Sequence, residues 1–443
     1  MACGLGLDSS FALAYAELGT AAYVGNNRPV GDAHFDRALS LLDRLTTREQ
    51  LQIRAASEAW RGNRDQSIAL RRTLLAEYPD DPAAWGQIGY EYMRLGRSAD
   101  AIAALRRQIE RDSTNAADYI NLASALKGTS DYEESVRAYT RAFALRPAMF
   151  RISNMNHEYG SVLVLAGRLA DARAVFDSML RGNAGQRASG ERSLAWLEMF
   201  QGHYDSAIAH FRQATLLMQI PDGQLSEGRN RLLFAAAAQA KGGAWRDSAS
   251  AQIRSAFELF RTVYIAPPFL WYVGTALARD GQLARAQEVL DTLGKRAKPA
   301  NPTDRANLLA LTGEVALARQ LADSAVRSLQ RAMAIDSSAL VTESLARALA
   351  HAGDLGGAIR LYESIAGKPA RWFGWEPQPA GLLAFWNVGQ LYEASGDTAR
   401  AAAAYGRLLA QWPSVDSDLI AVQHARARLN ELKSGRDNNS RRR

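Results

Sequence analysis

The sequence contains a single cysteine, Cys3, among 443 residues. A disulfide framework or a zinc site built from several cysteines is therefore excluded within the chain. No run of about 18 apolar residues occurs, so the sequence predicts no membrane-spanning helix. The start, Met1 to Leu5, lacks a charged stretch followed by an apolar core, and we expect no secretory signal peptide there.

Lysine is also scarce, with six residues among the 53 basic ones. The formal net charge is +7 and the sequence pI about 9.5, a balance that suits nucleic acid or an anionic membrane. However, the arginines are spread over the whole length, mostly beside Asp or Glu at helical spacing. The one basic run is 440–443 at the end of the chain. We therefore expect neither nucleic acid nor membrane as a partner.

Motifs that carry catalysis are missing. No Gly-x-x-x-x-Gly-Lys-Ser/Thr loop and no Gly-x-Ser-x-Gly elbow is present. His157-Glu158 has no second histidine one turn later, so the zinc protease pattern fails. The histidines are scattered: His34, His157, His203, His210, His351 and His424. The sequence predicts no enzyme, no cofactor and no metal site.

A period of 34 residues is the strongest pattern in the chain, clearest over 82–149. Equivalent positions in two successive periods are Trp85 and Tyr119, Gly89 and Ala123, and Leu105 and Tyr139. Apolar residues three and four apart lie on one face of a helix, and each period holds two such faces separated by a short turn. Each period is therefore predicted to be a helical hairpin, in which a small residue of the first helix faces a large residue of the second.

The same pairing recurs along nearly the whole sequence. Further small/large pairs are Gly19 with Phe35, Gly160 with Phe176, Ala195 with Phe211, Gly274 with Leu290, Gly313 with Leu329, Ala346 with Tyr362, and Gly389 with Tyr405. Turns are predicted at Gly62, Gly96, Gly167, Gly202, Gly281, Gly353 and Gly396. Two repeats are degenerate, those at 48–81 and at 229–262. In the first of them, Arg71 takes the large apolar position.

These patterns predict an all-α, right-handed solenoid of about eleven hairpins. A final helix over about Asp418 to Lys433, with an apolar stripe on one face, is expected to cap the array. We place an N-terminal array at 1–221, a C-terminal array with the capping helix at 222–434, and a disordered basic tail at 435–443. The spacer from Gly367 to Pro379 contains Trp372 and Trp375, which are expected either to pack on the solenoid or to contact a ligand or partner.

In stacked hairpins the first helices line a concave groove in which a peptide can lie. Positions beside the small packing residue of each first helix are the candidates for this groove. They are Tyr90, Arg94, Asn121, Lys127, His157, Arg192, Trp196, Phe200, Trp271, Arg279, Arg347 and Trp386, with Ser161, Thr275 and Gln390 beside them. Mixed aromatic and cationic side chains suit a peptide with apolar and acidic groups; a solvated surface is the other interpretation.

The repeat resembles the tetratricopeptide family, whose fold is a solenoid of helical hairpins. Three stretches also resemble the C-terminal arrays of bacterial serine/threonine kinases: 7–15, 44–49, and 389–393 continuing to Trp412 and Asp418. The catalytic kinase motifs are absent from the chain. These resemblances imply a non-catalytic scaffold that binds a protein or peptide, or alternatively a sensory module of a bacterial signalling system. We expect a cytoplasmic location, or else a periplasmic portion of a membrane-anchored system.

Overall fold

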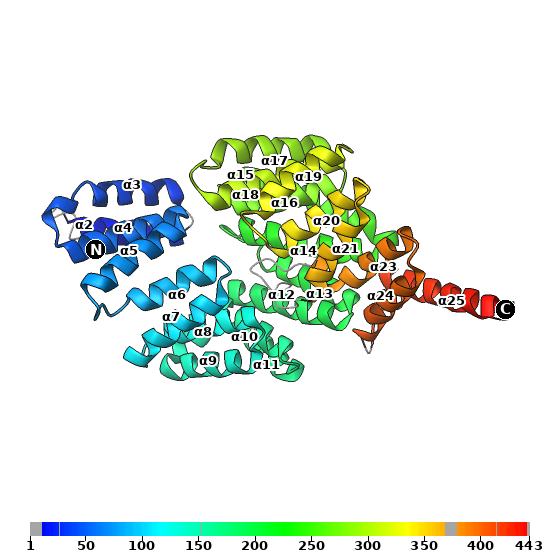
Figure 1. Ribbon diagram of the computed structural model, residues 1–443, viewed down its shortest axis with the longest axis horizontal. Helices are drawn as coiled ribbons and strands as arrows, with labels where there is room; N and C mark the ends of the chain where they lie inside the picture. The colour runs from blue at the N-terminus through cyan, green and yellow to red at the C-terminus, as the bar shows by residue number, and fades with distance from the viewer. Residues whose placement is uncertain (1–10, 26, 152, 368–378, 413, 441–443) are drawn as a thin grey trace. The chain divides into compact units, whose positions relative to one another are not determined.

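The computed structural model describes residues 11–25, 27–151, 153–367, 379–412 and 414–440. Helices and turns make up this described part, and it contains no strand. Its helices pair into eleven successive hairpins (Figure 1). The hairpins are α2 (Ala12–Val24) with α3 (Arg28–Leu39), α4 (Thr47–Arg61) with α5 (Arg64–Glu77), α6 (Ala84–Arg94) with α7 (Ser98–Arg111), α8 (Ala116–Thr129) with α9 (Tyr132–Leu145), α10 (Ser153–Leu165) with α11 (Leu169–Met179), α12 (Ala184–Gln201) with α13 (Tyr204–Leu216), α14 (Gln224–Lys241) with α15 (Arg246–Thr262), α16 (Pro267–Arg279) with α17 (Leu283–Arg296), α18 (Pro302–Ala318) with α19 (Ala322–Met333), α20 (Ala339–His351) with α21 (Leu355–Ala366), and α23 (Ala384–Ala394) with α24 (Thr398–Ala410).

The remaining elements are short, apart from the last helix. They are the 3-10 helices η1 (Leu42–Arg44), η2 (Pro147–Arg151) and η3 (Gly243–Trp245), the one-turn helix α22 (Pro379–Leu382), and α25 (Ile420–Ser440). The predicted all-α solenoid of eleven hairpins with a C-terminal helix is confirmed. No helix in the described part combines the length and the apolar character that crossing a membrane requires.

The chain forms two compact units. The first unit comprises residues 1–150 and 300–302, and the second comprises 151–299 and 303–443. The boundary predicted at 221/222 falls within the second unit, and that division into two arrays stays a prediction. Helix α25 continues to Ser440, into the segment for which the sequence predicts a disordered tail.

Small residues of first helices lie directly against large residues of second helices, as predicted. A Cβ added to Gly89 would come within 2.5 Å of Leu105, and one added to Gly160 within 2.1 Å of Phe176. Only a hydrogen fits at these positions, because real Cβ atoms do not approach other atoms so closely. The same contact is seen for Gly19 with Phe35, Gly313 with Leu329, and Gly389 with Tyr405.

One predicted pair is wrong. A Cβ on Gly274 would meet Leu311 at 2.6 Å and Val289 at 3.1 Å, rather than Leu290. Leu311 belongs to α18, the first helix of the next hairpin. The close approach at Gly274 therefore packs one repeat on the next as well as one helix on its hairpin partner.

The predicted turn glycines share one backbone conformation. All seven have a positive φ, from 72° at Gly96 to 94° at Gly62, in the left-handed region that glycine adopts without a steric penalty. Ser130 and Gln320 take the same conformation at the turns of two other hairpins, with φ of 69° and 63°. These turns therefore share one left-handed backbone conformation. Glycine is the usual residue at that position, but serine and glutamine also occur there.

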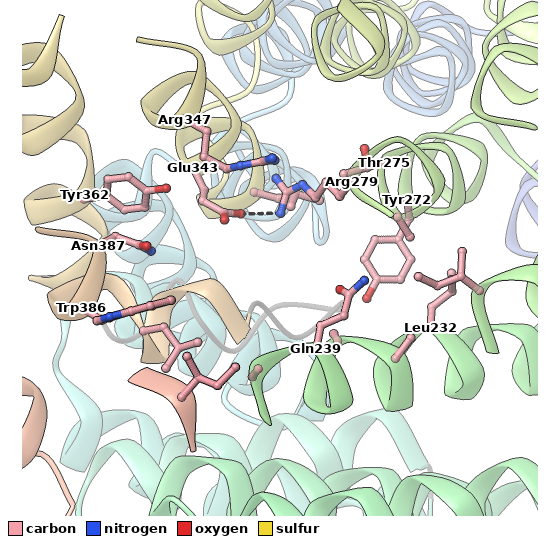
Figure 2. A pocket seen from close by; sticks show the side chains of 18 residues that line it. Leu232, Gln239, Tyr272, Thr275, Arg279, Glu343, Arg347, Tyr362, Trp386 and Asn387 are labelled. Carbon is pink, nitrogen blue, oxygen red and sulfur yellow. Dashed lines mark hydrogen bonds and ion pairs between the residues drawn. The ribbon is translucent and has the colours of Figure 1, made fainter. Parts of the chain in front are cut away.

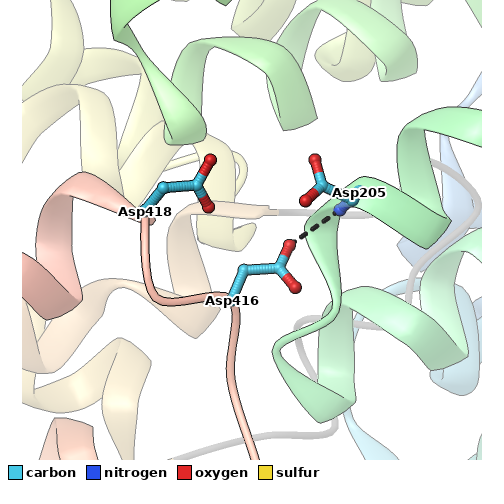
Figure 3. Close-up of side chains that lie close together, drawn as sticks. All are labelled: Asp205, Asp416 and Asp418. Carbon is cyan, nitrogen blue, oxygen red and sulfur yellow. Dashed lines mark hydrogen bonds between the residues drawn. The ribbon is translucent and has the colours of Figure 1, made fainter.

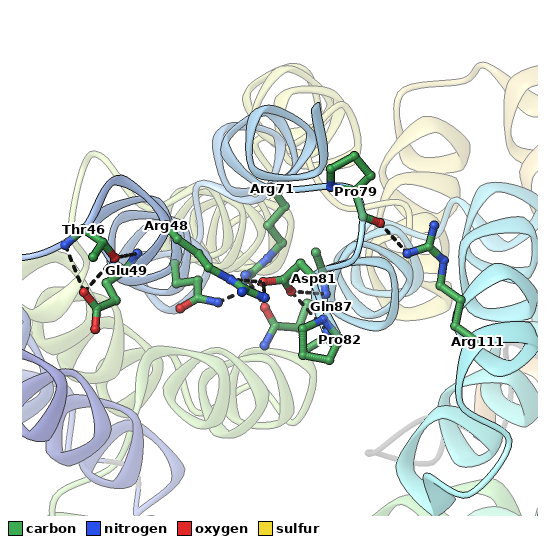
Figure 4. Close-up of polar contacts among 12 residues, drawn as sticks. Thr46, Arg48, Glu49, Arg71, Pro79, Asp81, Pro82, Gln87 and Arg111 are labelled. Carbon is green, nitrogen blue, oxygen red and sulfur yellow. Dashed lines mark hydrogen bonds and ion pairs between the residues drawn. The ribbon is translucent and has the colours of Figure 1, made fainter. Parts of the chain in front are cut away.

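The degenerate repeat at 48–81 joins the next hairpin through polar contacts (Figure 4). Arg71 is 5% exposed in its predicted apolar position, and it donates to the side chain of Gln87 on α6. Burial lowers the pKa of Arg71 to about 10, with Glu91 and Asp81 opposing that shift. Asp81 accepts hydrogen bonds from the amides of Ala83 and Ala84 at 3.1 and 3.0 Å, and so caps the start of α6.

The other degenerate repeat begins earlier than predicted. Helix α14 starts at Gln224, and its small packing residue is Gly228, where a Cβ would lie 2.6 Å from Phe260 of α15. The alanine run from Ala235 to Ala238 lies further along the same helix.

Candidate functional site

The second unit contains a pocket of about 400 Å³ between its first helices. Helices α14, α16, α20 and α23 supply most of its lining (Figure 2). We call it the inner pocket. Its apolar lining includes Leu232, Ala235, Ala236, Tyr272, Leu340, Leu383, Trp386 and Ile420, and its polar lining is Gln239, Thr275, Arg279, Glu343, Arg347 and Asn387, with the mixed side chain of Tyr362.

An arginine–glutamate network forms one side of the inner pocket. Arg279 contacts Glu314 at 2.7 Å and Glu343 at 2.9 Å, and Arg347 contacts Glu314 at 3.1 Å. Ser344 adds a 2.5 Å hydrogen bond from its hydroxyl to Glu314. The two carboxylates are nearly enclosed, whereas the side chains of Arg279 and Arg347 keep 22% and 30% of their surface exposed. The accessible part of the network therefore belongs to the two arginine side chains.

Glu314 anchors the network as an ionised carboxylate. Burial alone would raise its pKa, but the charges of Arg279 and Arg347 and the hydrogen bonds from Arg279 and Ser344 outweigh burial and lower the pKa to about 2. The same contacts raise the pKa of Arg279, again against the effect of burial. Both guanidinium groups are fixed in position, because each forms an ion pair with the buried carboxylate of Glu314.

The inner pocket also offers neutral hydrogen-bonding groups. The Thr275 side chain is 3% exposed, and its hydroxyl has no hydrogen-bond partner among the described residues. Gln239 and Asn387 place amide side chains in the lining, and Figure 2 shows Gln239 across the pocket from the arginines. An amide side chain can donate to and accept from a peptide group at once. The pocket thus combines an aromatic and aliphatic surface with groups that can bind a polypeptide backbone.

Comparison with known proteins identifies the repeat. Models of the tetratricopeptide repeat match residues 82–115, 120–187 and 383–414. The chain contains tetratricopeptide repeats. No curated protein matches the sequence. Repeats of this family are protein-interaction scaffolds, and in general terms that is the class of function to which the chain belongs.

Several solved structures contain similar stretches. A tetratricopeptide repeat protein from Parabacteroides merdae is 15% identical, with 68% of this chain and 98% of that chain covered and a TM-score of 0.37. A thermophilic one from Thermus thermophilus is 20% identical, with coverages of 44% and 100% and a TM-score of 0.35. Human IFIT1, solved as a dimer with m7Gppp-AAAA, is 14% identical, with both coverages 89% and a TM-score of 0.40.

The structure brings three of the predicted groove residues together. Arg279 on α16, Arg347 on α20 and Trp386 on α23 all line the inner pocket. Trp271 lies on α16 but packs against the core cluster around Leu329 and Leu345. Counted from the small packing residue of each helix, Arg279, Arg347 and Trp386 stand at positions +5, +1 and −3. Positions four apart share one face of a helix, so the repeat brings all three side chains to the same side of the array.

Two predicted groove residues lie in the core instead. Trp196 is 1% exposed, because α12 packs against α10, α11 and α13 and little of its surface remains open. Arg192 is 9% exposed and donates to Asn230 and Ser189, at 3.0 Å in both cases. Both side chains contribute to packing between repeats, and the assignment of Trp196 and Arg192 to an open groove is corrected.

The other candidates lie on first helices outside the inner pocket. Tyr90 and Arg94 on α6 are exposed, whereas Asn121 and Lys127 on α8 are half-buried. In the second unit, His157 contacts the Ser193 hydroxyl at 2.9 Å, and Phe200 is half-buried near the end of α12. Nothing tests a binding role for these residues, which stays a prediction. Trp372 and Trp375 lie outside the described residues.

Sequence reasoning missed a second cluster, around Lys241 at the end of α14. The Lys241 ammonium contacts Asp205 at 2.6 Å, Asp418 at 2.7 Å and Asp416 at 3.5 Å. The three carboxylates converge (Figure 3), and the ammonium supplies the positive charge that such a group needs. A lysine suits the position because its three N–H donors radiate from one atom. The signal in the sequence was a rare lysine, one of six.

Proposed function

We propose that the inner pocket binds a segment of a partner protein, with an apolar side chain of that segment inserted beside Trp386. The observation that carries the proposal is the lining of the pocket. Aromatic and aliphatic side chains there surround two arginines and the amide side chains of Gln239 and Asn387. Deep pockets with a few placed polar groups are the usual form of a binding site, and buried aromatic residues contribute most of the affinity of such contacts.

The pocket chemistry supports a segment that also carries hydrogen-bond acceptors. Arg347 lines the pocket with 30% of its side chain exposed, and its ion pair with Glu314 fixes its position. An acidic side chain or a backbone carbonyl of the segment can accept from this guanidinium. Thr275, Gln239 and Asn387 would hold the peptide groups on either side. The alternative of a sensory module in a signalling system stays a prediction.

The test is selection of peptides from a random display library against the full chain. Affinities of the enriched peptides are then measured for the wild type, for Trp386→Ala and for Trp85→Ala. Trp85 is a matched control, because it is a half-buried tryptophan of a first helix in the other unit, with Arg107 over its ring at 4.8 Å. We expect Trp386→Ala to weaken binding by about tenfold or more, and Trp85→Ala to change it less than about twofold.

The proposal is contradicted if no peptide is enriched, or if the enriched peptides bind Trp386→Ala as tightly as the wild type. Loss of binding in Trp85→Ala alone would place the site in the first unit. Circular dichroism of both variants checks that each keeps the helical content of the wild type.

A further inference from the structure

The C-terminal part of the second unit forms hydrogen bonds with the N-terminal part of the same unit. The indole N–H of Trp412 donates to the Phe200 carbonyl at 2.9 Å, between residues 212 positions apart in the sequence. The Asp416 amide donates to the Gly202 carbonyl at 3.1 Å, and Asp416 accepts from the Asp205 amide at 2.8 Å. The turn between α12 and α13 is therefore bound by residues that follow α24.

Lys241 holds the same connection by charge. Its side chain is 1% exposed, whereas those of Asp205 and Asp418 are 61% and 58% exposed. If residues 414–420 moved away, Lys241 would keep only one of its three carboxylates. The loss of two counter-charges is unfavourable, because a buried cation depends on the carboxylates around it. The contacts of Lys241 therefore favour the closed arrangement.

Closure also completes the inner pocket. Ile420 lines the pocket and follows Asp418 by two residues. It lies so close to Gly242 that a Cβ there would come within 1.9 Å of its side chain. The Lys241 contacts and this close approach together fix where Ile420 stands. One wall of the pocket therefore depends on residues that close the second unit.

Closure carries an opposing cost. The Tyr204 side chain is fully buried in contact with Trp412, at 6.4 Å between ring centroids. Its hydroxyl has no hydrogen-bond partner among the described residues, and a buried hydroxyl without a partner is unfavourable. Opening would return this hydroxyl to water. The favourable burial of Trp412 is thus offset in part, as expected of an element that can open.

We propose that Trp412 and residues 414–420 form a latch, which closes the second unit on itself and opens independently of the rest of that unit. Release of the latch removes Ile420 from the inner pocket and widens the entrance. For its consequence, the entry of a protein segment, this inference rests on the proposed function. The opening itself involves no ligand and can be measured on the free protein.

The test is hydrogen–deuterium exchange by mass spectrometry on the full chain, because local opening appears as faster exchange of the segment that opens. Lys241→Met removes the cation, and Lys295→Met is the control, an exposed lysine of α17. We expect peptides covering 202–208 and 414–422 to exchange about tenfold faster in Lys241→Met, with α16 and α17 unchanged. Lys295→Met should match the wild type.

Tyr204→Phe acts in the opposite direction. It removes the hydroxyl that only the closed arrangement buries, so exchange of 414–422 should slow by about threefold or more. The latch is ruled out if Lys241→Met leaves these peptides unchanged, or if the whole second unit loses protection together, since either result would make the contact a fixed part of the fold. Faster exchange in Tyr204→Phe would also overturn it.

Discussion

Glu314→Gln is expected to lower the free energy of unfolding of the second unit by about 3–5 kcal/mol, because it leaves two arginines inside the protein without their shared counter-charge. Glu314 is 1% exposed, and the other carboxylate of the network, Glu343, forms its ion pair with Arg279. Arginine does not lose its proton at any accessible pH, so the charge imbalance persists. Urea unfolding followed by circular dichroism gives the difference.

Glu288→Gln is the matched control for this substitution. Glu288 pairs with Arg261 on the surface, and the two side chains are 51% and 55% exposed. Exposed ion pairs contribute about 1 kcal/mol or less. Equal effects of the two substitutions would show that the network around Glu314 is not the buried anchor described here.

The destabilisation caused by Glu314→Gln is expected to depend on pH. The pKa of Glu314 is lowered from 4.5 to about 2 in the folded chain. Its contribution to stability is therefore complete above pH 4.5 and is lost as the pH falls toward 2. The stability difference between wild type and Glu314→Gln should shrink over that window. A difference that stays constant from pH 6 to pH 3 would contradict the lowered pKa.

Tyr139→Ala is expected to destabilise the first unit by about 3–5 kcal/mol, the usual cost of emptying a buried aromatic site. Tyr139 is fully buried, and it belongs to the same small/large pair as Ala123. Tyr90→Ala is the control, since Tyr90 is 36% exposed on a helix of the same unit. Thermal unfolding of the variants measures both effects.

A volume swap tests the pairing itself. Ala123→Phe alone should overpack the α8–α9 hairpin at a cost of about 1–3 kcal/mol. In the double variant Ala123→Phe/Tyr139→Ala, the new ring can occupy the emptied space, so the combined cost should be smaller than the sum of the two. Strictly additive costs would show that these two side chains do not share one site.

The hairpins could be predicted from the sequence because their determinants are local. The small residue, the turn glycine and the large residue of one hairpin lie within a single period, as in Gly89, Gly96 and Leu105. The contact of Gly274 with Leu311 was missed because its partner belongs to the next repeat. Periodicity within one hairpin does not reveal how far successive repeats are offset from each other along their helix axes.

The site was predicted in part for the same reason. Arg279, Arg347 and Trp386 lie on the same face of their first helices, and the repeat brings that face to one side of the array. Trp196 was misplaced, because neighbouring helices cover more of α12 than the pattern implies. The contact between Trp412 and Phe200 spans 212 positions, and no local pattern encodes it. Ile420 could be assigned to the pocket only once that contact was known.

The central claim is that the inner pocket of the second unit binds a segment of a partner protein. The most direct measurement is hydrogen–deuterium exchange of the full chain with and without a library-selected peptide. We predict slower exchange in α14, α16, α20 and α23, which line the inner pocket, and unchanged exchange in α15 and α17. Protection confined to those second helices or to the first unit, with the pocket helices unchanged, would contradict the account.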